Sequence, residues 1–97
     1  MEIKDLEPNS KVINLTGELN HLGETSSTPN GQKYQEGVIS DNTGQVKITF
    51  WDDQVGKFME GDTLSIKSGW CKQFEDELQI STGKYGKIEK IPKRYGK

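Results

Sequence analysis

The chain has 97 residues, of which only 30% are hydrophobic, so it predicts one small domain with a single core. A single cysteine and a single histidine exclude an internal disulfide and leave almost no ligands for a structural metal, so we expect neither a metal nor a cofactor. No apolar run approaches the roughly 20 residues that span a bilayer, and the N-terminus lacks the apolar segment of a signal peptide. We therefore expect a cytoplasmic protein without a membrane partner.

Charge is distributed unevenly along the sequence. The formal net charge is −2, but residues 84–97 carry six basic side chains and one acid, whereas residues 1–83 carry seven basic side chains and fourteen acids. The net charge of the whole chain is therefore a weak guide to its partners.

The first predicted strand follows the turn signal at residues 7–10. Residues 12–19 alternate, which predicts that Ile13, Leu15 and Leu19 face inward, with Gly17 on the same face, where a missing side chain suits a sharply coiled barrel strand. Residues 23–33 contain no apolar side chain and are rich in Ser, Thr, Pro, Gly and Asn, so they predict a long mobile loop.

Residues 34–41 predict the second strand and residues 45–51 the third, joined by a hairpin turn in which Gly44 is able to take a positive φ. The third strand has a strict period of two: Val46, Ile48 and Phe50 face inward, and Lys47, Thr49 and Trp51 face outward. After it, residues 52–59 predict one short helix, with Asp52 or Asp53 as its N-cap.

Residues 63–74 predict the fourth strand, in which Leu64 and Ile66 face inward. Simple alternation would then bury Trp70 and Phe74. We adopt the hypothesis that a bulge at Ser68–Gly69 reverses the parity, which would place Cys71 in the core and Trp70, Lys72 and Phe74 outside. Residues 75–77 predict a tight turn and residues 78–82 the fifth strand, after which the chain trails off. We expect residues 1–91 to form one domain and residues 92–97 to be a basic tail or the start of a linker.

This order of five strands with a helix between the third and fourth is the plan of the OB-fold, an all-β Greek-key barrel that binds oligonucleotides. The pieces SDNTGQVKITFWDD, GDTLSIKSGW and KQFEDELQISTGKYGKIEKI closely resemble the single-stranded DNA-binding proteins of the simple archaeal type, their human relatives and the OB modules of archaeal replication protein A. The resemblance covers the chain from Ile3 to Ile91. Where some of these relatives have a further aromatic residue late in the fifth strand, this chain has Ser81.

The resemblance implies single-stranded DNA binding in replication, recombination or repair. It implies that Trp51, Trp70 and Phe74 stack on bases, and exposed rings beside lysines suit a ligand with flat apolar rings and negative charge. The expected phosphate or polar contacts are Lys33, Lys47, Thr49, Lys67, Lys72, Lys84 and Lys87.

Two other functions fit the same pattern: an OB subunit of a replication protein A-like complex that contacts proteins, and an RNA- or tRNA-binding OB domain. Replication and repair proteins are therefore possible partners. No catalytic constellation is visible, since Asp52 and Asp53 have no histidine or nucleophile near them in the sequence, so we expect neither an enzyme nor a small-molecule substrate. The DNA-binding interpretation further predicts that the protein is associated with the nucleoid.

Overall fold

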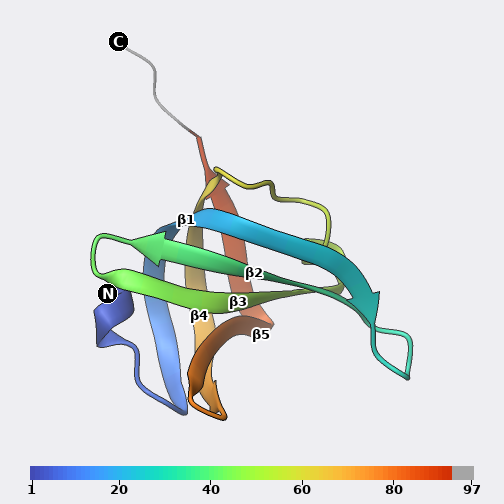
Figure 1. Cartoon of the computed structure of the whole chain (residues 1–97), viewed down its shortest axis with the longest axis horizontal. Helices are drawn as coiled ribbons and strands as arrows, with labels where there is room; N and C mark the ends of the chain where they lie inside the picture. Colours follow the sequence, from blue (N-terminus) through green and yellow to red (C-terminus); the bar gives the residue numbers. More distant parts are fainter. Residues whose placement is uncertain (93–97) are drawn as a thin grey trace.

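The computed structural model describes residues 1–92, and within this range it describes only the backbone of residues 83–85. Five strands close into one barrel in the order β1-β2-β3-β5-β4, which confirms the predicted all-β OB-fold (Figure 1). β3 and β5 run parallel, and every other neighbouring pair is antiparallel. The strands are β1 (Ser10–Ser27), β2 (Lys33–Asp41), β3 (Gly44–Trp51), β4 (Thr63–Phe74) and β5 (Glu77–Ile91).

β1 closes the barrel because it changes partner along its length. Its first half pairs with β4 and its second half with β2, so that Glu18 lies opposite both Thr63 and Ser40. Gly17 faces the interior at this crossing, and a Cβ atom built on it would lie 2.7 Å from the carbonyl oxygen of Ser40. The predicted role of Gly17 is therefore confirmed, since a side chain here would push β1 away from β2.

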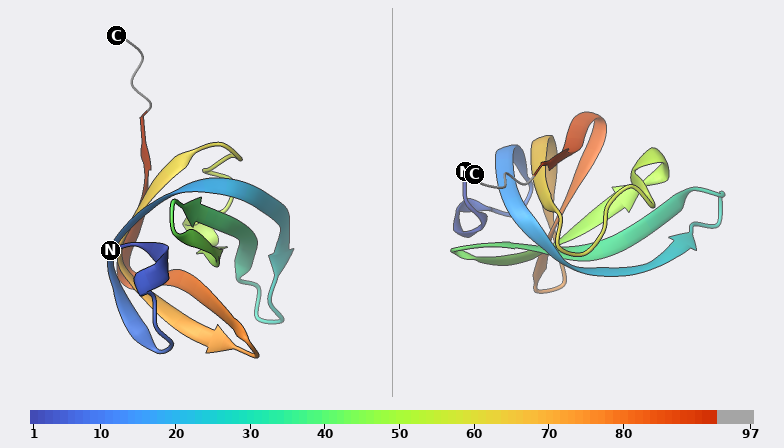
Figure 2. Two further views of the ribbon diagram at one scale, coloured as in Figure 1. Left: turned by 60° about the vertical axis from the view of Figure 1, so that its left-hand side comes forward. Right: turned by 90° about the horizontal axis from the view of Figure 1, so that it is seen from above.

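The two turned views in Figure 2 show the ribbon of the barrel, and the core side chains are buried within it. The inward residues predicted on the third strand are buried as expected, and Cys71 is completely buried. Desolvation by burial raises the pKa of the Cys71 thiol. The core side chains are Ile3, Leu6, Val12, Leu15, Leu19, Ile39, Val46, Ile48, Phe50, Phe58, Leu64, Ile66, Cys71, Ile80 and Ile88.

The predicted change of parity in β4 is present at Ser68. This residue has a φ of 56°, in the left-handed region, and the pairing of β4 with β5 shifts between Lys67 and Gly69. Beyond it Gly69 and Cys71 face inward, while Trp70 is 43% exposed. The bulge hypothesis is therefore confirmed. The extra residues of this irregularity belong to β5, because residues 83–86 of β5 lie opposite the single residue Ser68 of β4.

The inward position predicted for Ile13 is wrong, because its side chain is 73% exposed. β1 and β4 keep one register on both sides of the irregularity, with Val12 opposite Gly69 and Asn14 opposite Lys67. Since cross-strand partners point to the same side of a sheet, β1 must change parity where β4 does. Val12 takes the inward position instead of Ile13.

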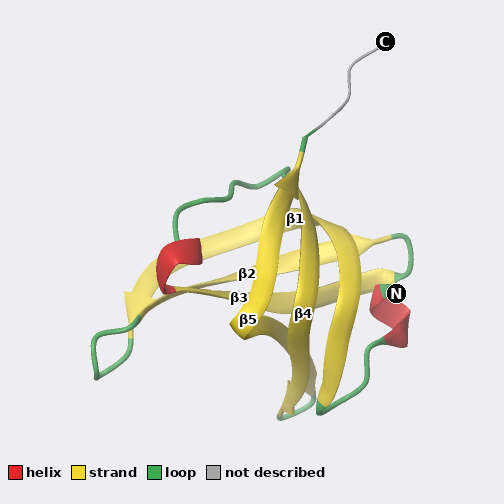
Figure 3. Cartoon of the chain, turned by 180° about the vertical axis from the view of Figure 1, so that it is seen from behind, coloured by secondary structure: helices red, strands yellow, loops and turns green. Residues whose placement is uncertain are grey.

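The helix predicted for residues 52–59 is wrong. Only a 3-10 turn, η2 (Asp52–Gln54), is present, and Figure 3 shows it as one of two short red elements. Asp52 and Gly56 have φ values of 49° and 83°, which are incompatible with a continuous right-handed helix. Asp52 and Asp53 are not the N-cap of η2, because Trp51 occupies that position and its N–H donates to Gln54 Oε1. Phe58 still packs on Phe50, with their ring centroids 5.4 Å apart.

β1 and β5 extend well beyond their predicted bounds. Most of the expected loop at residues 23–33 belongs to β1 and β2, which extend past the barrel as a two-stranded ribbon that ends in the turn at residues 28–32 (Figure 1). Polar residues suit such a ribbon because both of its faces are open to water. β5 likewise continues to Ile91 instead of ending at residue 82. The division into residues 1–91 and a tail remains a prediction.

A short N-terminal turn, η1 (Ile3–Asp5), is held against the β2–β3 hairpin. The Asp41 carboxylate accepts the N–H of Ile3 at 2.8 Å, the N–H of Thr43 at 2.7 Å and the Thr43 hydroxyl at 2.6 Å. Desolvation alone would raise the pKa of Asp41, but these hydrogen bonds outweigh it and lower the pKa below its usual value. Gly44 does not adopt the positive φ that glycine allows, and Asp41 stabilises the turn through its hydrogen bonds with Thr43.

Candidate nucleic-acid interface

The outer surface of β3, β5 and β4 carries the predicted aromatic residues together. Outward positions of β3 hold Lys47, Thr49 and Trp51, and the outward positions of β4 after the parity change hold Trp70, Lys72 and Phe74. The first part of β5 lies between these two strands and pairs with both. The barrel therefore joins two segments of sequence into one face, which we call the aromatic face.

Register shows which side chains are neighbours on this face. One row across the sheet holds Val38, Lys47, Gln79 and Lys72, each opposite the next on the adjacent strand. The next row holds Glu36, Thr49, Ser81, Trp70 and Lys11. Adjacent strands are about 4.8 Å apart, so each row spans about the width of a few nucleotides. The middle of the second row holds the small side chains of Thr49 and Ser81, and Trp70 lies next to Ser81.

The three predicted stacking residues differ in exposure. Phe74 is 63% exposed and Trp70 is 43% exposed, so both rings offer surface to a ligand. Trp51 is half-buried because it lies beside Tyr34, its cross-strand partner, with the ring centroids 5.4 Å apart and the planes tilted by 38°. Tyr34 thus fixes Trp51 and adds a fourth aromatic ring to the face.

A groove of about 200 Å³ runs beside Trp51. Thr49, only 8% exposed, Ser81 and Lys72 form part of its lining. Trp70 is the cross-strand partner of Ser81, so it stands next to the groove on the side away from Trp51. The full lining is Tyr34, Glu36, Thr49, Trp51, Lys72, Gln79, Ile80 and Ser81.

The charges on the aromatic face are mixed. Lys47 Nζ lies 3.3 Å from Glu77 Oε1, an exposed ion pair at the start of β5. Within the described part of the chain, Lys72 and Lys11 make no such pair. Lys11 lies directly opposite Trp70. The unpaired lysines are therefore on the β4 and β1 side of the face.

Three of the predicted basic contacts lie away from the aromatic face, and the side chain of a fourth is outside the described residues. Lys67 and Lys87 are cross-strand partners, and both come from the part of the barrel beyond the register shift. Lys33 is exposed at the end of the β1–β2 ribbon, opposite Ser27. The side chain of Lys84 lies outside the described residues.

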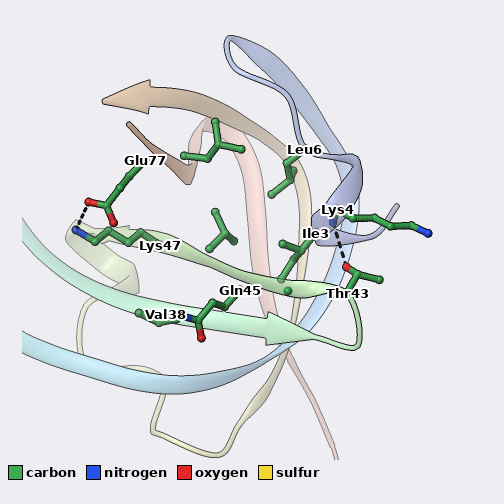
Figure 4. Close-up of a pocket in the computed structure, with 11 residues that line it drawn as sticks. Ile3, Lys4, Leu6, Val38, Thr43, Gln45, Lys47 and Glu77 are labelled. Atoms are coloured by element: carbon green, nitrogen blue, oxygen red, sulfur yellow. Dashed lines mark hydrogen bonds and ion pairs between the residues drawn. The ribbon is translucent and has the colours of Figure 1, made fainter. Parts of the chain in front are cut away.

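A larger hollow lies elsewhere, between the η1 turn and the start of β3 (Figure 4). It measures about 510 Å³ and is lined by apolar side chains such as Ile3, Leu6 and Leu78, with the Lys47–Glu77 ion pair at its rim. None of its lining residues is aromatic. Size alone does not make it the better site for unpaired bases, because stacking requires flat rings.

Sequence reasoning missed Tyr34, Glu36 and Lys11. A signal existed for the first two, because a two-residue hairpin turn between Asp41 and Gly44 fixes the register that places Tyr34 opposite Trp51. No local signal pointed to Lys11, since it reaches Trp70 through long-range pairing of β1 with β4.

Among the described residues, no three His, Cys, Asp or Glu side chains gather closely enough to hold a metal ion. The described part of the chain also contains no helix long and apolar enough to span a membrane.

A closed five-stranded barrel with aromatic and basic side chains on its outer sheet defines an OB-fold of the type that accommodates single strands of nucleic acid. The profile of one family, "Single-stranded DNA binding protein Ssb-like, OB fold", matches residues 6–90. The chain belongs to this family, which confirms the resemblance inferred from its sequence motifs.

Individual relatives agree with this assignment. The single-stranded DNA-binding protein Ssb of Saccharolobus solfataricus is 30% identical over 90 residues, which cover 90% of this chain but only 61% of that protein. A domain of replication protein A from Methanococcus maripaludis has a similar structure, with a TM-score of 0.81, 23% identity and coverage of 96% of both chains. The OB domain of Ta0387 from Thermoplasma acidophilum has a TM-score of 0.79 at 18% identity, over 99% of this chain and 90% of that one. At these identities the two structures show the shared fold alone.

Proposed function

We propose that this chain binds single-stranded DNA by stacking bases on Trp51, Trp70 and Phe74. The observation that carries the proposal is that all three rings lie on one continuous outer face of the barrel. Stacking on an aromatic ring contributes about 1–3 kcal/mol per base and accepts any sequence, because every base has a π-face. Family membership supports this ligand over others.

Phosphate contacts come from the lysines around the rings. Lys72 lines the groove, and Lys47 lies in the same row, two strands away. Lys11, opposite Trp70, adds a contact that the sequence did not suggest. We assign Lys67 and Lys87 to phosphate contacts with bound DNA that continues past Trp70 along β4. Thr49 is assigned to a polar contact at the groove. Lys33 and Lys84 remain predictions.

The biological setting proposed is the coating of exposed single strands during replication, recombination or repair, without catalysis by this chain. The comparison supports the ligand class, but the chain spans only about three fifths of the curated relative, so the activity and partners of that whole protein remain proposals here. The nucleoid location and contacts with replication or repair proteins are likewise predictions.

An NMR titration with a short oligo-dT tests the proposal through the indole N–H signals of Trp51 and Trp70. We expect both signals to shift, and the affinity to fall as salt rises, because lysine–phosphate contacts release counterions. Unchanged signals at micromolar protein would contradict the proposal. A parallel titration with oligo-U separates DNA from RNA preference, since the 2′-hydroxyl distinguishes the two. If the indole signals do not change with either oligonucleotide but shift with a peptide from a replication protein, the chain would instead be a protein-binding OB domain.

A further inference from the structure

Glu36 is the one carboxylate among the side chains that line the groove beside Trp51. It lies opposite Thr49, and its neighbour Tyr34, two residues earlier on β2, lies opposite Trp51. Diagonal positions of this kind are about 7–8 Å apart between their Cα atoms. The edge of a base stacked on the Trp51 indole therefore lies within reach of the Glu36 carboxylate.

The Glu36 carboxylate makes no hydrogen bond or ion pair with any described residue. Lys72 lines the same groove and still leaves it unpaired. An anionic side chain repels phosphate, so the backbone of a bound strand is expected to lie toward Lys72 and Lys11 on the opposite side of the face. The bases then point toward β2 and Glu36.

A carboxylate accepts hydrogen bonds and donates none, so it distinguishes bases by their donors. Adenine, cytosine and guanine carry an exocyclic amino group, and guanine adds a ring N–H beside it, which makes two parallel donors. Thymine has no amino group, and its single N–H stands between two carbonyl oxygens that repel an anion. The polar neighbours in the groove, Thr49, Gln79 and Ser81, both donate and accept, so they discriminate less.

We propose that Glu36 is a specificity-determining residue, which favours a base with an amino group over thymine at the nucleotide stacked on Trp51. This inference rests on the proposed function and refines it, because the other stacking positions still accept any base. Carboxylate–amino pairs are an established means of recognising cytosine at its N4.

The test compares oligo-dC with oligo-dT, each about 12 nucleotides long to fit one OB-fold. Tryptophan fluorescence quenching gives the two dissociation constants and their ratio for the wild-type chain, for Glu36→Gln and for Glu89→Gln. Glu89 is exposed on β5 opposite Ser65, beyond the register shift, so its substitution changes the net charge equally without touching the groove.

We expect Glu36→Gln to reduce the preference for dC over dT by about fivefold relative to the wild type, as loss of one good base contact predicts. Glu89→Gln should leave the ratio at its wild-type value. An unchanged ratio in Glu36→Gln would overturn the inference, and so would an equal gain in affinity for both oligomers, since Glu36 would then act only by repelling phosphate. Failure of the wild-type chain to bind either oligomer would instead refute the proposed function.

Discussion

Substitution of Trp70 by alanine separates binding from folding. Trp70 is 43% exposed and stands on the outer face between Lys11 and Ser81, so its removal opens no cavity in the core. Loss of one stacked base amounts to about 1–3 kcal/mol, which corresponds to about a fivefold to 150-fold rise in the dissociation constant for oligo-dT. We expect the free energy of unfolding to fall by about 1 kcal/mol or less, as for other surface substitutions.

The assay is fluorescence anisotropy of a labelled oligo-dT at one fixed salt concentration, with thermal unfolding of the same samples. A loss of 1 kcal/mol shifts the melting temperature of a domain of this size by about 4–8 °C, so binding and stability effects are separable. Met59→Ala serves as a matched control, because Met59 is 69% exposed and does not line the groove. Trp70→Phe should retain much of the affinity. If Trp70→Ala binds within twofold of the wild type while remaining folded, stacking on this ring is refuted.

Three further predictions concern an ion pair, a turn and a strand crossing. Glu77→Gln releases Lys47 from an exposed pair worth about 0–1 kcal/mol, so oligo-dT should bind up to about fivefold more tightly, and weaker binding in the same anisotropy assay would contradict this. The folded state lowers the pKa of Asp41 below 3.8, so its carboxylate stabilises the fold above that pH, and this contribution is lost as pH falls through the folded-state pKa. Asp41→Asn should therefore be least stable relative to the wild type at neutral pH. Urea unfolding that shows a pH-independent difference between the two proteins would refute the assignment. Gly17→Ala places a Cβ 2.7 Å from the Ser40 carbonyl oxygen and should cost about 1–3 kcal/mol in urea unfolding, whereas a change below about 0.5 kcal/mol would show that β1 adjusts freely.

Local patterns predicted a large part of the fold. The strict alternation from Val46 to Trp51 fixed which side of β3 faces the core, because a strand has a side-chain period of two. The parity change at Ser68 was predicted as a bulge, because Gly69 permits one and the expected outward position of Trp70 required it. The site residues of β3 and β4 follow from these two arguments together with the family resemblance.

Errors arose where a long-range contact overrode a local pattern. Ile13 belongs to an alternating run, but β1 stays in register with β4 and changes parity with it, so the side chain is exposed. Residues 23–27 contain no apolar side chain, yet they form a strand because β2 supplies backbone hydrogen-bond partners for a ribbon outside the barrel. One further error has a local cause: the helix predicted after Trp51 is absent, because Asp52 and Gly56 adopt left-handed backbone conformations.

The sequence by itself determined the all-β class, the inward and outward residues of β3 and the presence of exposed rings among lysines, because these depend on side-chain period and solvation within one segment. Only the tertiary structure decided which of those residues are neighbours. β5 inserts between β3 and β4 and β1 pairs with β4, so Trp51, Trp70 and Lys11 meet on one face although they are far apart in the sequence. Glu36 enters the groove for the same reason, since the register of strand pairing across the hairpin places it beside Thr49 and next to Trp51.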